Sequence, residues 1–278
     1  MNIAVMSPHC HGNGNTTSAA LIAAALAKQN VKVCLTHVKA KSDALYPYYN
    51  FSAGAGTTDA VQLTKLIRTG GMQSNNFVNY CKNISEGFDL FSLDTSDTDK
   101  SVVISEEEVT DVVDFIAKNA PYDYVVFDVD ENSLDKPNVM KVIEDADIVV
   151  LILSQAITEI SRFKGMKNQF TSRISKLPCI VVVNKYRSTL GNIKDLAKEI
   201  EVKHIEHWHA LHDNPYVIWC ENQGKLAYLT SEIKKNNPDV IELNIDLQKI
   251  AQDIIYTKRE LSRKRAASRK AKKDEEDY

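Results

Sequence analysis

The chain has 278 residues, of which 44% are hydrophobic, so it could form one large domain or two small ones with a full core. Its longest apolar run, Ile148–Leu153, is too short to span a bilayer, and five scattered cysteines favour a reducing cytoplasm over a disulfide framework. The net charge of −3 is uneven: residues 258–278 hold nine basic and five acidic side chains, and the rest holds 25 and 32. An acidic body argues against a broad nucleic-acid-binding face.

The chain opens with a pattern that cradles phosphate. An apolar strand over Asn2–Met6 leads into residues 9–17, HCHGNGNTT, and an Ala/Leu-rich helix is predicted over residues 16–28. Such a strand, glycine-containing loop and helix N-terminus bind phosphate because backbone N–H groups and the helix dipole point at the anion. The sequence therefore predicts a phosphate-binding loop at the first strand.

This loop lacks the charge that such loops normally carry. In the pattern G-x-x-x-x-G-K-[ST], the lysine reaches the outer phosphates and the hydroxyl holds Mg²⁺. Gly14 and Thr16 occupy the second glycine and the hydroxyl, whereas His9 occupies the first glycine and Asn15 the lysine. The frame is present without its lysine, which favours retained binding over retained hydrolysis.

Further along, apolar runs alternate with amphipathic stretches. Several runs are continuous Val/Ile segments, as expected for strands buried on both faces of a parallel sheet. The predicted strands are Asn2–Met6, 31–36, 88–93, Tyr124–Val129, Ile148–Leu153, 179–183 and 216–220, and the predicted helices are 16–28, 58–69, 106–118, 137–146, 157–175 and 193–203. This alternation predicts a doubly wound α/β fold with a mainly parallel sheet of about seven or more strands, centred on Asn2–Met6 and Tyr124–Val129.

Two segments fall outside this alternation. Residues 46–56 are rich in Tyr, Gly and Ser and are predicted to form a long loop. A final amphipathic helix is expected from near Asp246, and residues 258–278 then become basic without a large apolar residue after Leu261 until Tyr278. We expect a domain over 1–257 and a tail over 258–278 that is a frayed helix or disordered.

Taken in order, these motifs resemble those of the ParA/MinD superfamily of deviant-Walker P-loop ATPases. The matching segments are 12–17 (family G-V-G-K-T-T), 30–35 (the strand before the first switch), 121–128 (the Walker B strand), 146–150 (the strand after it) and 181–185 (the strand whose asparagine contacts adenine). The resemblance implies a P-loop domain that binds ATP or ADP with Mg²⁺ and forms a homodimer. The nucleotide-binding residues that it implies are Gly12, Asn13, Gly14, Asn15, Thr16, Thr17 and Asn184. If nucleotide binds, Thr16 and Asp128 would hold Mg²⁺.

The departures from the family pattern concern catalysis. Cys10 stands at the signature lysine that reaches across the family's dimer, and Asn15 stands at the Walker A lysine. His37 and Lys39 replace the two aspartates of the first switch, and residues 129–132, VDEN, differ from the usual D-T-P-P. Phosphoryl transfer depends on charge stabilisation, so we assign no catalytic residue and expect little or no ATPase activity. Lys39 could replace the lost charge, but a solvated loop lysine is the simpler interpretation.

Two further features have open interpretations. His204, His207, His209 and His212 resemble a metal cluster, yet no single conformation gathers all four, and surface or strand-end histidines are the alternative. Residues 258–273 could attract DNA, anionic lipid or a protein partner weakly, but the tail has no apolar face for stable membrane anchoring.

Loss of the lysines is similar to the atypical TadZ/CpaE branch, although this chain lacks the receiver-like domain that many of those proteins carry. We therefore predict a cytoplasmic, dimeric nucleotide-binding or pseudo-ATPase scaffold that positions or assembles a pilus, secretion, conjugation or partition machine through a protein partner. Such a protein could take a polar or membrane-peripheral position through that partner. The alternatives are a partition-type protein that binds DNA through its basic tail, and an active ATPase with relocated catalytic charges.

Overall fold

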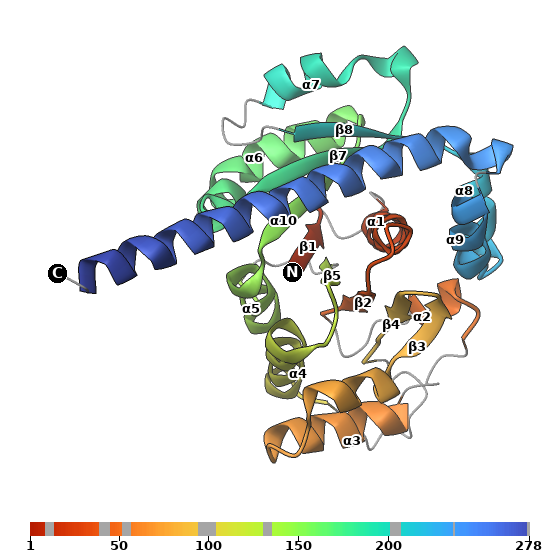
Figure 1. The fold of residues 1–278 in the computed structure, drawn as a ribbon. Coiled ribbons are helices and arrows are strands. Elements are labelled where there is room, and N and C mark those ends of the chain that lie inside the picture. Colours follow the sequence, from red (N-terminus) through yellow and green to blue (C-terminus); the bar gives the residue numbers. More distant parts are fainter. Residues whose placement is uncertain are drawn as a thin grey trace.

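A computed structural model describes residues 1–8, 14–38, 45–51, 57–93, 104–129, 135–200, 207–235 and 237–276, and gives the backbone alone for 57–60, 169, 234 and 269–276. Eight strands form one sheet with helices on both faces (Figure 1). The sequence-predicted positions Cys10, Gly12, Asn13, Lys39 and 130–132 lie outside the described residues. In the described part of the chain, no helix is both long enough and apolar enough to cross a membrane.

The sheet is parallel except at one edge. Its strands are β1 (Asn2–Met6), β2 (Val33–His37), β3 (Lys82–Ser85), β4 (Phe88–Leu90), β5 (Tyr124–Val129), β6 (Ile148–Leu153), β7 (Cys179–Tyr186) and β8 (His207–His212). Their order is β3-β4-β2-β5-β1-β6-β7-β8, and only β3 and β4 pair antiparallel. The doubly wound α/β fold and the central place of Asn2–Met6 and Tyr124–Val129 are thus confirmed.

Each face of the sheet has its own apolar core. One core joins α1 (Asn15–Ala27), α2 (Leu45–Tyr48), α8 (Pro215–Asn222), α9 (Leu226–Lys235) and α10 (Ile241–Glu276) to the sheet. The other includes α3 (Thr57–Arg68), α4 (Glu106–Asn119), α5 (Pro137–Asp145), α6 (Ile157–Ile174) and α7 (Ile193–Ile200). All residues of β5 and β6 are buried, because both faces of these central strands are covered. Helix α1 buries every residue except Thr16, and its alanines allow it to pack closely against the sheet and α10.

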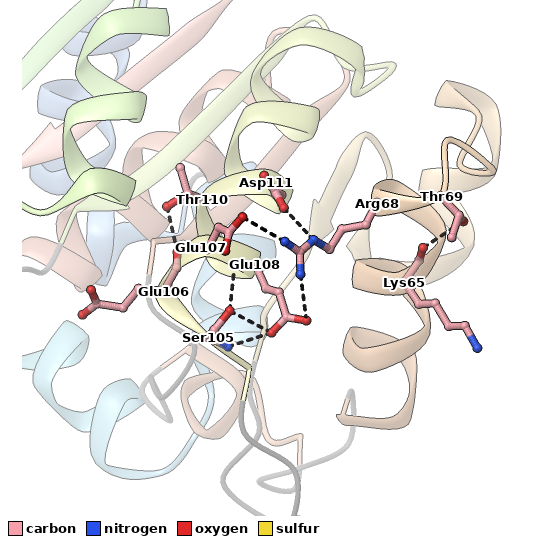
Figure 2. A network of polar contacts seen from close by, with 9 residues as sticks. All are labelled: Lys65, Arg68, Thr69, Ser105, Glu106, Glu107, Glu108, Thr110 and Asp111. Carbon is pink, nitrogen blue, oxygen red and sulfur yellow. Dashed lines mark hydrogen bonds and ion pairs between the residues drawn. The ribbon is translucent and has the colours of Figure 1, made fainter.

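The outer helices α3 and α4 are joined by a charged network around Arg68 (Figure 2). The guanidinium of Arg68 lies 2.9 Å from Glu107 Oε1 and 3.1 Å from Asp111 Oδ2. Ser105 and Glu108 form a capping box at the start of α4, which fixes where that helix begins. These side chains are largely exposed, so each ion pair contributes less than about 1 kcal/mol and the buried face of α4 supplies most of its anchoring.

Several sequence-based boundaries were wrong. Residues 216–220 were predicted as a strand but form part of α8, because Asn214 caps that helix and Pro215 occupies its first position. The final strand is instead β8, which pairs with β7. The predicted strand 88–93 is shorter, as β4, and pairs with the polar edge strand β3, which had not been predicted.

Other differences concern the loop at 46–56 and the last helix. Residues 46–48 of that region belong to the short helix α2, whose Leu45 and Tyr46 are buried in the core, and residues 52–56 lie outside the described residues. Helix α10 begins at Ile241, before the predicted start near Asp246, and continues to Glu276, so residues 258–276 are helical. Its last turns extend away from the sheet (Figure 1).

Candidate functional site

The side chain at the Walker A lysine position points into the protein. Asn15 is the first residue of α1 and is only 5% exposed. Its Nδ2 donates to Asp128 Oδ1 at 2.6 Å and also lies 3.2 Å from the Val5 carbonyl oxygen and 3.3 Å from that of Val129. Asp128, in β5 next to Val5 of β1, is fully buried. The amide therefore satisfies a buried carboxylate at the C-terminal ends of the two central strands.

Gly14 caps α1 in a conformation that requires glycine. It has φ of 69° and ψ of 38°, in the left-handed region, and a Cβ atom there would lie 2.5 Å from Nδ2 of Asn184. Asn184 is at the end of β7, where the β7–β8 register shifts and the following Lys185 has φ of 52°. The sequence-predicted residues Gly14 and Asn184 are thus in direct proximity, although 170 positions apart in the chain.

A hollow lies between these two residues and α8. Including its open mouth, it has a volume of about 400 Å³. Polar groups from α1, β7, the segment after β8 and α8 line it together with apolar side chains, as is typical of small-molecule sites. Its lining residues are Gly14, Thr17, Leu21, Asn184, Lys185, Leu211, His212, Asp213, Asn214, Val217, Ile218, Glu221 and Leu243.

Glu221 connects α8 to the first turn of α1. The Thr17 hydroxyl donates to the Glu221 carboxylate, and the two residues are 204 positions apart. No pattern in the sequence singled out Glu221, because the segment that contains it had been predicted as a strand. The available signal was the Asn214–Pro215 helix start, which would have placed Glu221 in the last turn of a helix.

The loops at the C-terminal ends of β6, β7 and β8 are also tied together. Gln155 accepts a 2.7 Å hydrogen bond from the Arg187 backbone N–H, and Arg187 Nε donates to Asp213 Oδ2 at 2.9 Å. Asp213 lines the hollow, so this chain of contacts fixes one of its walls. Sequence reasoning missed all three residues, which belong to no motif.

The described residues do not present a preformed Mg²⁺ site. Thr16 lies in the first turn of α1, and Asp128 lies at the end of β5 near it, as the resemblance implied. However, Asp128 exposes no surface and one of its oxygens already accepts the Asn15 amide. A cation at this position would need Asn15 to release that carboxylate.

The predicted first-switch position His37 lies at the end of β2, beside Asp128 in register. It is buried, and its Nε2 lies 2.5 Å from the Ser92 hydroxyl. This places an imidazole ring and a hydroxyl, in place of a carboxylate, among the ends of the central strands. The arrangement offers no described aspartate or glutamate in the position of the family's switch acid.

The histidines of β8 contact two aspartates of α10. His207 Nδ1 and His209 Nε2 lie 3.0 Å and 2.8 Å from the same oxygen of Asp253, which confirms that an extended segment places both on one face. His212 Nδ1 lies 2.6 Å from Asp246. Within the described residues, no group of three or more His, Cys, Asp or Glu side chains is arranged to hold a metal ion. Position 204 lies outside the described residues.

Similarity to known proteins is visible in structure and not in sequence. No family model matches the chain, and no curated protein matches it. Among solved structures, a ParA family ATPase from Chlorobium tepidum TLS has a TM-score of 0.66 at 17% identity, over 90% of this chain and 98% of that one. A chain of the MinC:MinD cell division protein complex from Aquifex aeolicus has a TM-score of 0.65 at 17% identity, over 91% of this chain and 95% of that one. This chain has the fold of the ParA and MinD ATPases.

Another neighbour gives the same fold with ligand. MinD of Pyrococcus horikoshii OT3, determined in complex with Mg-ADP, has a TM-score of 0.63 at 14% identity over 91% of this chain and 95% of that one. The ParA/MinD fold extends across almost the whole chain.

Proposed function

We propose that this protein is a degenerate member of the ParA/MinD superfamily that acts as a nucleotide-binding or pseudo-ATPase scaffold. It would position or assemble a larger machine for a pilus, secretion, conjugation or partition, in the manner of the TadZ/CpaE branch. The observation that carries the proposal is the contact between Asn15 and the buried Asp128.

Phosphoryl transfer needs positive charge at the outer phosphates and at the metal. Asn15 supplies none, and its amide is turned inward to neutral carbonyls and to Asp128. Asp128, which would help to hold the metal, thus binds Asn15 and stabilises the fold. This use supports a protein that retained the ParA/MinD architecture after hydrolysis was lost.

Nucleotide binding remains part of the proposal. Gly14, Thr17 and Asn184 line the hollow, and residues 12–17 keep the loop pattern apart from the lysine. ATP or ADP would use these groups, with Thr16 and Asp128 taking Mg²⁺ only after Asn15 released the carboxylate. Phosphate should therefore add little to affinity.

The proposed partners are a second copy of the chain and a protein of the larger machine. Ile157 is 77% exposed at the start of α6, and Leu190 is 66% exposed at the end of the 3₁₀ helix Ser188–Leu190. Gln155 connects these two loops through Arg187 and Gly191, which holds the apolar side chains on one end of the sheet. Exposed apolar side chains on a fixed surface favour protein contact.

Sedimentation velocity of the full chain tests the scaffold role. We expect a dimer whose self-association is unchanged by ATP and Mg²⁺. The matched variant Asp128→Asn should also be a dimer with and without ATP and Mg²⁺. A chain that sediments as a monomer alone and as a dimer with ATP and Mg²⁺ would be a nucleotide-driven switch, and the scaffold proposal would be wrong.

The basic tail supports a weaker second contact. Residues 258–276 continue α10 as a helix that extends beyond the sheet (Figure 1), and residues 258–273 hold nine basic side chains and one acidic one. We propose weak, salt-sensitive attraction to DNA or anionic lipid through this segment. A partition-type role with DNA binding as the main activity would require this attraction to persist at physiological salt.

A further inference from the structure

The charges around the hollow are unfavourable for a polyphosphate. Among its described lining residues, Lys185 is the one lysine or arginine, whereas Asp213 and Glu221 are both carboxylates. Asp213 is paired with Arg187, which lies outside the lining. Glu221 instead places its carboxylate against the Thr17 hydroxyl, in the first turn of α1.

The first turn of a helix attracts anions, and here it already has one. Backbone N–H groups and the helix dipole give the start of α1 a partial positive charge. The Glu221 carboxylate can use that charge, so a phosphate group at the same turn would meet a like charge at short range. Nothing at position 15 offsets the repulsion, because Asn15 is neutral and points to Asp128.

Helix α8 holds Glu221 firmly in this place. Cys220 is fully buried, and Lys225 donates its backbone N–H to the Cys220 carbonyl oxygen at 2.8 Å. The Lys225 ammonium lies 4.7 Å from the centre of the Trp219 ring, and that ring stacks on Tyr216. The contact with Thr17 therefore comes from an anchored helix.

The remaining walls suit a flat, uncharged group. Leu21, Leu211 and Leu243 supply apolar surface, and Asn184 supplies an amide that can both donate and accept hydrogen bonds. The Glu221 carboxylate is a good acceptor for sugar hydroxyls, as in sites where Asp or Glu binds a ribose. A polar, uncharged ring joined to a sugar could bind Asn184 through the ring and Glu221 through the sugar hydroxyls.

We propose that this hollow binds an uncharged nucleoside in preference to a nucleoside triphosphate, with Glu221 as the residue that sets this preference. The inference deepens the proposed function and rests on it, since it concerns the same nucleotide site. Glu221 accepts the ribose hydroxyls of a nucleoside, and its charge repels the phosphates of ATP. The ligand site consists only of described residues.

Isothermal titration calorimetry of the full chain tests this preference. The probes are adenosine, guanosine, and ATP with and without Mg²⁺. We expect one nucleoside to bind at least about tenfold more tightly than ATP, and Mg²⁺ to leave ATP affinity unchanged. Glu221→Gln, which keeps the shape and removes the charge, should weaken nucleoside binding and strengthen ATP binding, and so reduce the preference at least about tenfold.

Two variants control for indirect effects. Glu144→Gln removes an exposed carboxylate on α5, far from the lining residues, and should leave all affinities unchanged. Thr17→Val removes the hydroxyl that Glu221 binds but keeps the carboxylate, so exclusion of ATP should persist. Thermal melting of each variant checks that it is folded.

The outcomes separate this inference from the proposed function. If ATP with Mg²⁺ binds more tightly than both nucleosides, or if Glu221→Gln leaves the preference unchanged, the inference is overturned and the scaffold proposal stands. If no probe binds to the wild-type chain or to Glu221→Gln, both the inference and the nucleotide-binding part of the proposed function are wrong.

Discussion

Replacing the buried Asn15 by alanine should destabilise the protein strongly. The change removes the amide that lies 2.6 Å from Asp128 Oδ1 and leaves that fully buried carboxylate without its Asn15 donor. A hydrogen bond to a charged group is worth about 1.5–3 kcal/mol, and a buried charge that loses its donor costs more. We therefore expect the free energy of unfolding to fall by about 3 kcal/mol, which corresponds to a melting temperature lower by roughly 6–10 °C.

The assay is urea unfolding at pH 7.5, followed by circular dichroism, in a double-mutant cycle with Asp128→Asn. Once the charge at position 128 is removed, the Asn15→Ala change should cost only about 1 kcal/mol, as for a neutral hydrogen bond. The coupling energy is then about 2 kcal/mol. A loss below 1 kcal/mol for Asn15→Ala alone, or a coupling energy near zero, would refute the structural role of this contact.

Three other changes have defined outcomes. Deleting residues 262–278 removes the exposed Arg265 ion pair with Asp147 and no apolar core, so the melting temperature should shift by about 2 °C or less. Any binding of DNA or vesicles should weaken and become less salt-sensitive. A melting temperature lower by several degrees would mean that the tail is docked on the domain. Burial lowers the pKa of His209 below its usual 6.5, so the contribution of this residue to stability should be full above pH 6.5 and should fall as the pH drops toward the lowered pKa. Thermal melts of His209→Gln from pH 7.5 to 5 should show a melting temperature that depends less on pH than that of the wild-type chain. An equal pH dependence in both chains would exclude His209 as the cause. Asn15→Lys should tighten ATP binding in calorimetry without restoring phosphate release, and restored turnover would show that one lysine was the only deficiency.

The central part of the fold could be predicted because its residues carry a local signal. The continuous Val/Ile runs of β5, β6 and β7 are too apolar for a sheet with an exposed face, so they indicated a parallel sheet covered on both sides. The motif order also implied that Asp128 lies opposite Thr16, at the start of the first helix. It could not predict that the Asn15 amide turns inward, because that depends on what else the buried carboxylate can bind.

One wrong secondary-structure prediction arose where aromatic and β-branched residues favoured a strand. Tyr216, Val217, Ile218 and Trp219 have strand-forming side chains, yet Asn214 starts a helix there whose outer face leaves Trp219 44% exposed. Edge strand β3 was missed because its sequence, KNIS, is polar. Glu221 has no local signal at all, since its role comes from a contact with Thr17 across 204 positions.

Loss of hydrolysis can be measured as phosphate release by the purified full chain with ATP and Mg²⁺. Asp128→Asn serves as the matched control, because a contaminating ATPase would give equal rates in both preparations. We expect phosphate release at the background rate in both the wild-type and the Asp128→Asn preparations. Turnover on the order of 1 s⁻¹ or faster in the wild-type chain, lost in Asp128→Asn, would contradict it and identify an active ATPase with relocated charges.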